Sequence, residues 1–142
     1  EVAGKKAPTC FGKKATLRAK GSQPVTGTVG DDVIVGDGGD NTIFASQGND
    51  RVCGLGGNDT IRKDEAAGTL LASGGAGDDE LRAGFGDALL DGGDGDDRLR
   101  VDSTDQTRAY LLLGGKGSDA FFTSGADNAV CVASSGEVPF VC

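Results

Sequence analysis

The chain has 142 residues and a formal net charge of −8, and it contains 26 glycines but no histidine, tryptophan or methionine. Without histidine it cannot carry a Ser-His-Asp triad, a Cys-His pair or a histidine-ligated zinc site, and its length fits one domain. Residues 1–30 hold six of the 14 basic residues and one of the 22 acidic ones, so the rest is an acidic body that needs counter-cations and repels nucleic acid.

Residues 1–26 precede any regular pattern and are expected to form an N-terminal cap. Within them, "CFGKKATLRA" is compatible with an irregular strand. The chain begins at Glu1 rather than methionine, which fits a mature protein after removal of a signal peptide and equally a trimmed chain. No apolar run approaches ~18 residues, so membrane insertion is not expected.

The four cysteines, Cys10, Cys53, Cys131 and Cys142, lie far apart and form no C-x-x-C pair. A zinc ribbon or a redox motif is therefore not expected. An even number of cysteines at wide spacing predicts two disulfides and an oxidising compartment. We therefore expect a secreted protein, extracellular or at the cell surface.

From residue 27 the chain repeats with a nine-residue period, G-G-x-G-x-D-x-U-x, in which U is apolar. Four units follow one another without a gap: GTVGDDVIV (27–35), GDGGDNTIF (36–44), ASQGNDRVC (45–53) and GLGGNDTIR (54–62). Five more are GGAGDDELR (74–82), AGFGDALLD (83–91), GGDGDDRLR (92–100), GGKGSDAFF (114–122) and TSGADNAVC (123–131). Two irregular stretches, 63–73 and 101–113, each count as one degenerate repeat with inserted residues.

This pattern resembles the repeats-in-toxin (RTX) calcium-binding nonapeptides over about residues 27–131. The resemblance implies an all-β fold, a right-handed parallel β-roll or β-solenoid. In it, the first six positions of a repeat form a turn and the last three a short strand. Two repeats make one coil, and Ca²⁺ ions lie between stacked turns. Residues 1–26 would then be a disulfide-linked cap, residues 27–131 the roll and residues 132–142 a C-terminal cap closed by a disulfide.

The opening "CFGKKATLRA", followed by the cysteine of "NDRVCG", also resembles small secreted actinobacterial members of this family. On this resemblance Cys10 pairs with Cys53 and joins the cap to the roll. Cys131 pairs with Cys142 and closes the C-terminal loop. This is one of three possible pairings of four cysteines.

The x-U-x ending places one side chain inward and two outward, because side chains alternate along a strand. The inward set is Ile34, Ile43, Val52, Ile61, Leu81, Leu90, Leu99, Leu112, Phe121 and Val130. Such a core is thin for this length, so bound ions and disulfides are expected to supply much of the stability.

Alternate repeats share one edge of the roll. The edge that we call the irregular edge carries at position six Asp32, Asp50, a degenerate unit, Ala88, Tyr110 and Asn128. The other, the acidic edge, carries Asn41, Asp59, Asp79, Asp97 and Asp119. Carboxylates stacked ~4.8 Å apart repel by roughly 3 kcal/mol at an effective dielectric of about 20, so the acidic column indicates cations between its members.

The candidate calcium ligands are therefore Asp32, Asn41, Asp50, Asp59, Asp79, Asp97 and Asp119. We expect four sites on the acidic edge and one on the irregular edge, between Asp32 and Asp50. A single G-x-D turn is more often a metal-free Asx-turn, and this alternative is favoured beyond Asp50 on the irregular edge. The position-five acids and amides are expected to point to solvent.

The outer face of the sheet that follows the irregular edge is largely apolar. Its members are Val33, Val35, Arg51, Cys53, Leu71, Leu89, Asp91, Leu111, Leu113, Ala129 and Cys131. Soluble monomers seldom expose such a patch, so the N-terminal segment, the inserts or another subunit is expected to cover it.

An enzyme is not expected, because the chain lacks histidine and a nucleophile elbow and a thin roll leaves no room for a pocket. The leading interpretation is a secreted, calcium-stabilised structural protein. It would assemble with itself through the roll ends or the apolar sheet face into an extracellular fibre or surface layer. The alternative is a monomeric extracellular binding or adhesion module for a cell-wall polymer or a protein partner. An ice-binding role is disfavoured because the outward positions lack a regular threonine array.

Overall fold

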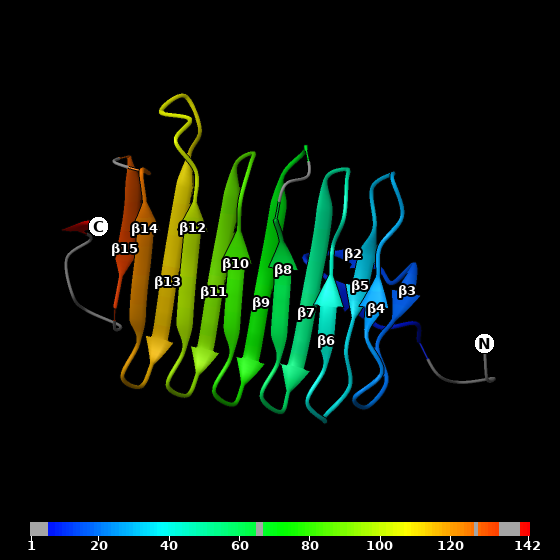
Figure 1. Cartoon of the computed structure of the whole chain (residues 1–142). Coiled ribbons are helices and arrows are strands. Elements are labelled where there is room, and N and C mark those ends of the chain that lie inside the picture. Colours follow the sequence, from blue (N-terminus) through cyan, green and yellow to red (C-terminus); the bar gives the residue numbers. More distant parts are fainter. Residues whose placement is uncertain (1–5, 65–66, 127, 134–139) are drawn as a thin grey trace.

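The computed structural model describes residues 6–64, 67–126, 128–133 and 140–142. Within these ranges the protein is all-β, and its strands wind into a parallel β-solenoid of about six turns (Figure 1). The fold class predicted from the repeats is confirmed. The described ranges contain no helix long and apolar enough to cross a membrane.

Two sheets face each other across the core. The six-stranded sheet consists of β4 (Val25–Thr26), β6 (Thr42–Phe44), β8 (Thr60–Lys63), β10 (Glu80–Ala83), β12 (Arg98–Asp102) and β14 (Ala120–Ser124). The eight-stranded sheet consists of β3 (Leu17–Arg18), β5 (Val33–Val35), β7 (Asp50–Gly56), β9 (Leu70–Ala76), β11 (Ala88–Asp94), β13 (Tyr110–Lys116), β15 (Ala129–Val132) and β16 (Phe140–Val141). From β3 to β15 successive strands alternate between the sheets, so each coil uses two repeats. Among the described strands of these two sheets, β16 alone pairs antiparallel with its neighbour.

Parallel register stacks each repeat position on the same position of the next coil. One inward column is Ile43, Ile61, Leu81, Leu99 and Phe121. The facing column is Ile34, Val52, Ala72, Leu90 and Leu112. All of these side chains are buried except Phe121, which is partly buried and packs against the others. The predicted inward positions are confirmed from Ile34 to Phe121.

The prediction for the last repeat is wrong by one residue. Leu111 pairs with Val130 and Leu112 with Cys131, so Cys131 enters the core with 0% exposure while Val130 lies on the outer face. Position six of this unit is Ala129 rather than Asn128. One additional turn residue reverses the inward and outward alternation of the strand that follows.

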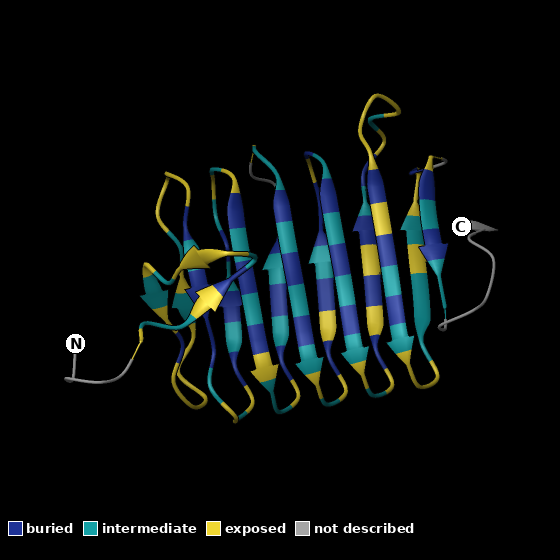
Figure 2. Ribbon diagram, turned by 180° about the vertical axis from the view of Figure 1, so that it is seen from behind, coloured by how far each residue is buried: buried dark blue, intermediate teal, exposed yellow. Residues whose placement is uncertain are grey.

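The N-terminal segment covers one end of the eight-stranded sheet's outer face (Figure 2). The strands β1 (Thr9–Cys10) and β2 (Lys13–Lys14) pair antiparallel, and β1 packs against β5 and β7. As a result Val35, predicted to face outward, is fully buried. The sheets already begin at β3 and β4, within the segment assigned to the cap, and the predicted cap boundaries stay predictions.

Both predicted disulfides are present. Cys10 and Cys53 join the cap to β7 with a Cα–Cα distance of 5.7 Å. Cys131 and Cys142 join β15 to the C-terminus with a Cα–Cα distance of 5.8 Å.

Candidate metal-binding edge

The acidic edge consists of the turns 36–41, 54–59, 74–79, 92–97 and 114–119, which run along the lower side of Figure 1. Each turn leads from the eight-stranded sheet to the six-stranded sheet. The structure brings the predicted position-six residues of these turns into one column, because each backbone N–H donates to the side-chain Oδ1 of the next coil's position six. The N–H donors of Asn41, Asp59, Asp79 and Asp97 lie 2.7, 2.7, 2.8 and 3.0 Å from their acceptors on Asp59, Asp79, Asp97 and Asp119.

The second carboxylate oxygen of each aspartate in this column has no partner. Oδ2 of Asp59, Asp79, Asp97 and Asp119 is buried and accepts no hydrogen bond. An unsatisfied buried carboxylate oxygen is costly, since its hydration has been lost without replacement. The Oδ2 atoms from Asp59 to Asp119 therefore form a row without a positively charged or hydrogen-bonding partner.

The electrostatics of the column agree with this. Burial raises the pKa of Asp59, Asp79 and Asp97 to about 6 from the ordinary 3.8, although each accepts a backbone N–H bond that lowers the pKa. Neighbouring carboxylates raise the pKa of all three further. The negative charge of these groups is thus disfavoured as long as no cation accompanies it.

The glycines of the motif let the turns approach each other. A Cβ on Gly92, at position one, would lie 2.2 Å from Asp97 Oδ2 of the same turn. Gly95, at position four, has a φ of +137°, and a Cβ there would lie 2.0 Å from the carbonyl oxygen of Gly77 in the preceding turn. Main-chain carbonyls and carboxylates therefore crowd the same narrow edge, and these are the hard oxygen ligands that Ca²⁺ takes.

Main-chain oxygens are needed to complete any site here. Within the described ranges, no place gathers three or more acidic, cysteine or histidine side chains in metal-binding geometry. The arrangement differs in this respect from a compact cage of carboxylates. It fits a cation held between stacked turns by one or two carboxylates and several carbonyls.

The position-five side chains are exposed, as predicted, but they also have a structural role that the sequence reasoning missed. Oδ1 of Asp40, Asn58, Asp78 and Asp96 accepts the backbone N–H of position five in the next turn, at 2.7, 2.9, 2.9 and 2.9 Å. Short Asp and Asn side chains commonly satisfy turn amides in this way. The recurrence of Asp or Asn at position five was the available signal.

Asn41, at the N-terminal end of the column, differs from the four aspartates. Its Nδ2 donates to the carbonyl oxygen of Gly21 and to Asp37 Oδ1, both at 3.0 Å. Its Oδ1 accepts the N–H of Asp37 at 3.0 Å. The Asn41 amide is thus already satisfied, whereas the aspartates that follow it are not.

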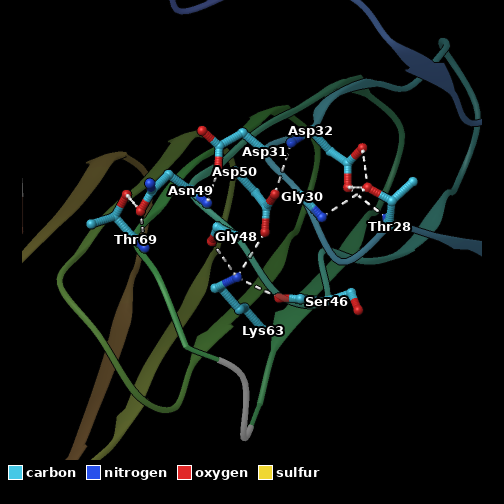
Figure 3. Close-up of polar contacts among 10 residues, drawn as sticks. All are labelled: Thr28, Gly30, Asp31, Asp32, Ser46, Gly48, Asn49, Asp50, Lys63 and Thr69. Carbon is cyan, nitrogen blue, oxygen red and sulfur yellow. Dashed lines mark hydrogen bonds and ion pairs between the residues drawn. The ribbon is translucent and has the colours of Figure 1, made fainter.

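The two predicted ligands on the irregular edge also have partners within the protein (Figure 3). The Asp32 carboxylate accepts the N–H and the hydroxyl of Thr28, at 2.6 and 3.0 Å. Asp50 Oδ1 accepts the N–H of Asp32 at 3.0 Å, and its Oδ2 pairs with Lys63 Nζ at 2.7 Å. Lys63 was missed because it lies in a stretch where the repeat is irregular. The available signal was a lysine at position one of a unit that lacks an acid at position six.

Beyond Asp50 the irregular edge has no acid at position six. The column continues with Leu70, Ala88, Tyr110 and Ala129, all of them buried. The prediction that this edge loses its acidic column halfway is confirmed.

A family model described as the RTX calcium-binding nonapeptide repeat (4 copies) matches residues 26–61 and 73–103. The match includes three of the four turns whose aspartates carry a free Oδ2, and it omits the stretch that contains Lys63. No curated protein and no solved structure matches the chain.

Proposed function

The repeats of this chain belong to the RTX calcium-binding nonapeptide family, and we propose that the protein is a structural β-roll whose acidic edge is completed by calcium. The observation that carries the proposal is the row of four buried, unpartnered Oδ2 atoms on Asp59, Asp79, Asp97 and Asp119. A structural role for these carboxylates without a cation would leave each of them unsatisfied.

The four carboxylates define three spaces between consecutive turns, one fewer than the four sites expected from the sequence, because the Asn41 side chain at the start of the column is already satisfied within the protein. In each space the position-six carboxylates and the carbonyl oxygens at positions two and four would hold one ion. Calcium supplies positive charge that offsets burial and mutual repulsion of the aspartates. Because the column does not exist in the unfolded chain, binding free energy becomes folding free energy. Extracellular calcium-binding modules commonly have Kd values of about 10⁻⁴–10⁻³ M.

The two disulfides support an extracellular location for the protein. Disulfides persist in oxidising environments and are rare in reducing ones. A chain whose acidic edge becomes ordered only at the higher calcium level outside the cell would suit secretion.

We also propose that the folded roll associates with itself. Four apolar side chains, Leu71, Leu89, Leu111 and Val130, stack in register on the outer face of the eight-stranded sheet beyond the cap. They line part of a groove of about 530 Å³, and Leu111 is 39% exposed. Pairing of this face with a second copy would remove it from water. End-to-end contacts of rolls would then extend pairs into a fibre or layer.

Calcium binding is tested by calorimetric titration of chelator-treated protein, with circular dichroism as the readout of folding. We expect binding at up to millimolar calcium, together with a gain of strand signal. Asp97→Asn keeps a hydrogen-bond acceptor but removes one charge, so it is expected to weaken binding. Asp96→Asn is the matched control, because Asn58 already occupies position five in an equivalent turn. Absence of binding at millimolar calcium would contradict the proposal.

A further inference from the structure

Lys63 is an unusual member of the protein core. It ends β8 in an inward column with Ala83 and Val101, and its side chain is 0% exposed. Lysine is almost never fully buried unless it is paired. A lysine that crosses from the strand into the preceding turn therefore needs partners for all of its donors.

The ammonium of Lys63 finds three oxygen partners in one turn (Figure 3). Nζ donates to the carbonyl oxygen of Ser46, to the carbonyl oxygen of Gly48 at 2.8 Å, and to Asp50 Oδ2 at 2.7 Å. An ammonium has three N–H donors. Two carbonyls and one carboxylate thus use its donors completely.

These three oxygens belong to positions two, four and six of the repeat 45–53. The backbone there has the same form as on the acidic edge: φ is +70° at Ser46 and +100° at Gly48, against +111° at Gly93 and +137° at Gly95. The carboxylates are held alike as well, since Oδ1 of Asp50 accepts the N–H of position six one coil earlier, as Oδ1 of the acidic-edge aspartates does. The difference lies in Oδ2, which is free on the acidic edge and paired with an ammonium here.

We propose that the turn 45–50 is a cation site built like those of the acidic edge, and that the Lys63 ammonium is its permanent cation. The assignment of Lys63 stands on its own contacts, whereas the comparison with calcium rests on the proposed function. The turn is complete without a metal ion, so the site expected there between Asp32 and Asp50 is replaced by a side chain.

The sequence around Lys63 explains how a side chain can enter at this point. On the acidic edge the aspartate at position six restricts position one of the same turn, because a Cβ at Gly54, Gly74, Gly92 or Gly114 would lie 2.0–2.2 Å from that aspartate's Oδ2; the turn 45–50, whose Oδ2 pairs with Lys63, has Ala45 there. In the unit that begins at Lys63, position six is Leu70, so this restriction is lifted. Loss of the acid in one coil thereby makes room for a lysine that neutralises the acid in the coil before it.

The consequence is that the two edges depend on calcium to different extents. The irregular edge is held by an internal ammonium and then by apolar side chains, so its turns stay closed in calcium-free protein. The acidic edge is the part that opens when calcium is removed.

Amide hydrogen exchange of the full chain, read by mass spectrometry in chelator and in calcium, tests this. The reporters on the irregular edge are the N–H groups of Gly48 and Asp50, which donate to Ala67 and Thr69 at 3.1 and 2.9 Å. Those on the acidic edge are Gly77 and Gly95, which donate to Asp94 and Lys116, both at 2.8 Å. We expect calcium removal to speed exchange at the acidic-edge amides and to leave Gly48 and Asp50 protected. Parallel loss of protection on both edges would overturn the proposal.

Lys63→Met supplies the matched variant. It is expected to speed exchange of the turn 45–50 by about 100-fold in chelator and in calcium alike, since it leaves Asp50 buried without a partner. Lys116→Met is the control, because the Lys116 side chain is 78% exposed and lies 3.4 Å from Asp94. Equal protection of the turn 45–50 in both variants would refute the role of Lys63.

Reductive methylation of the unmodified sequence covers the case in which Lys63→Met does not fold. Lys63 is expected to resist methylation in chelator and in calcium, while Lys116 reacts in both. Rapid methylation of Lys63 in folded protein would overturn the assignment. If Lys63 is protected but exchange of the acidic-edge amides does not change with calcium, the assignment of Lys63 holds and the proposed calcium function fails.

Discussion

At the scale of single residues, main-chain atoms of adjacent coils leave no space for a side chain at some of the glycines. Gly95 illustrates this, because its left-handed backbone and the nearby Gly77 carbonyl both disfavour any side chain. Gly38, also on the acidic edge, has neither restriction, since nothing lies within 4 Å of a Cβ there. The repeat therefore needs glycine at defined positions and merely tolerates it at others.

Gly95→Ala is expected to destabilise the protein by about 2 kcal/mol or more, because alanine at positive φ is strained and its Cβ clashes with backbone. Gly38→Ala should change stability by less than about 0.5 kcal/mol. Urea unfolding in calcium measures both. Similar midpoints for the two variants would contradict the close stacking of the turns.

At the scale of elements, the acidic edge acts as one unit, since each turn donates a hydrogen bond to the aspartate of the next. The aspartates of this edge also share one electrostatic effect. Burial raises the pKa of Asp59, Asp79 and Asp97 to about 6, so in calcium-free protein these groups hold protons that the unfolded chain releases near 3.8.

Calcium-free protein is therefore expected to lose stability as the pH rises from about 4 through about 6, because in this window the folded state binds more protons than the unfolded state. The loss is complete above about pH 7. Bound calcium should remove this dependence, and calcium affinity should rise over the same range because protons compete for the carboxylates. Urea midpoints of protein freed of calcium on a chelating resin measure the effect.

The control for this pH dependence is the triple variant Asp59→Asn, Asp79→Asn and Asp97→Asn. It keeps hydrogen-bond acceptors in the column but cannot titrate there, so its calcium-free stability should vary less with pH. If the slope of the triple variant equals that of the unmodified sequence, other groups cause the dependence.

At the scale of the whole molecule, the two edges of the roll differ from each other, and so do the outer faces of its two sheets. One edge has free carboxylates, and the other is closed by Lys63 and apolar residues. The cap covers the N-terminal end of the eight-stranded sheet (Figure 2). The apolar row Leu71, Leu89, Leu111 and Val130 lies on the later strands β9, β11, β13 and β15 of the same sheet. If the roll associates with itself as proposed, this asymmetry predicts that a single face takes part.

Leu89→Lys combined with Leu111→Lys is expected to abolish assembly, because two buried ammonium groups would face a second copy. Phe122→Lys is the control, since Phe122 is 48% exposed but belongs to the six-stranded sheet. Electron microscopy with and without calcium measures the outcome. Dispersed particles of the unmodified sequence at high concentration in calcium would instead favour the monomeric binding module.

Much of the fold followed from local pattern. The inward positions from Ile34 to Leu112 and the acidic column from Asn41 to Asp119 were predictable, because a strict period repeats the same steric choice in every coil. The last repeat was not, since one extra turn residue near Asn128 shifted the strand and moved Cys131 into the core. The burial of Val35 could not be predicted from the repeat either, because it depends on where the cap docks.

The residue types within one nine-residue repeat were enough to predict the inward positions and the acidic column, while the solenoid with two repeats per coil was implied by the resemblance to the RTX repeats. The nine-residue pattern does not show that one of the aspartates pairs with a lysine. Lys63 follows Asp50 by 13 residues along the chain, and it reaches the carboxylate only because consecutive coils stack in register. Only the stacked arrangement distinguishes the turns whose aspartate Oδ2 has no partner from the turn whose aspartate Oδ2 pairs with a lysine.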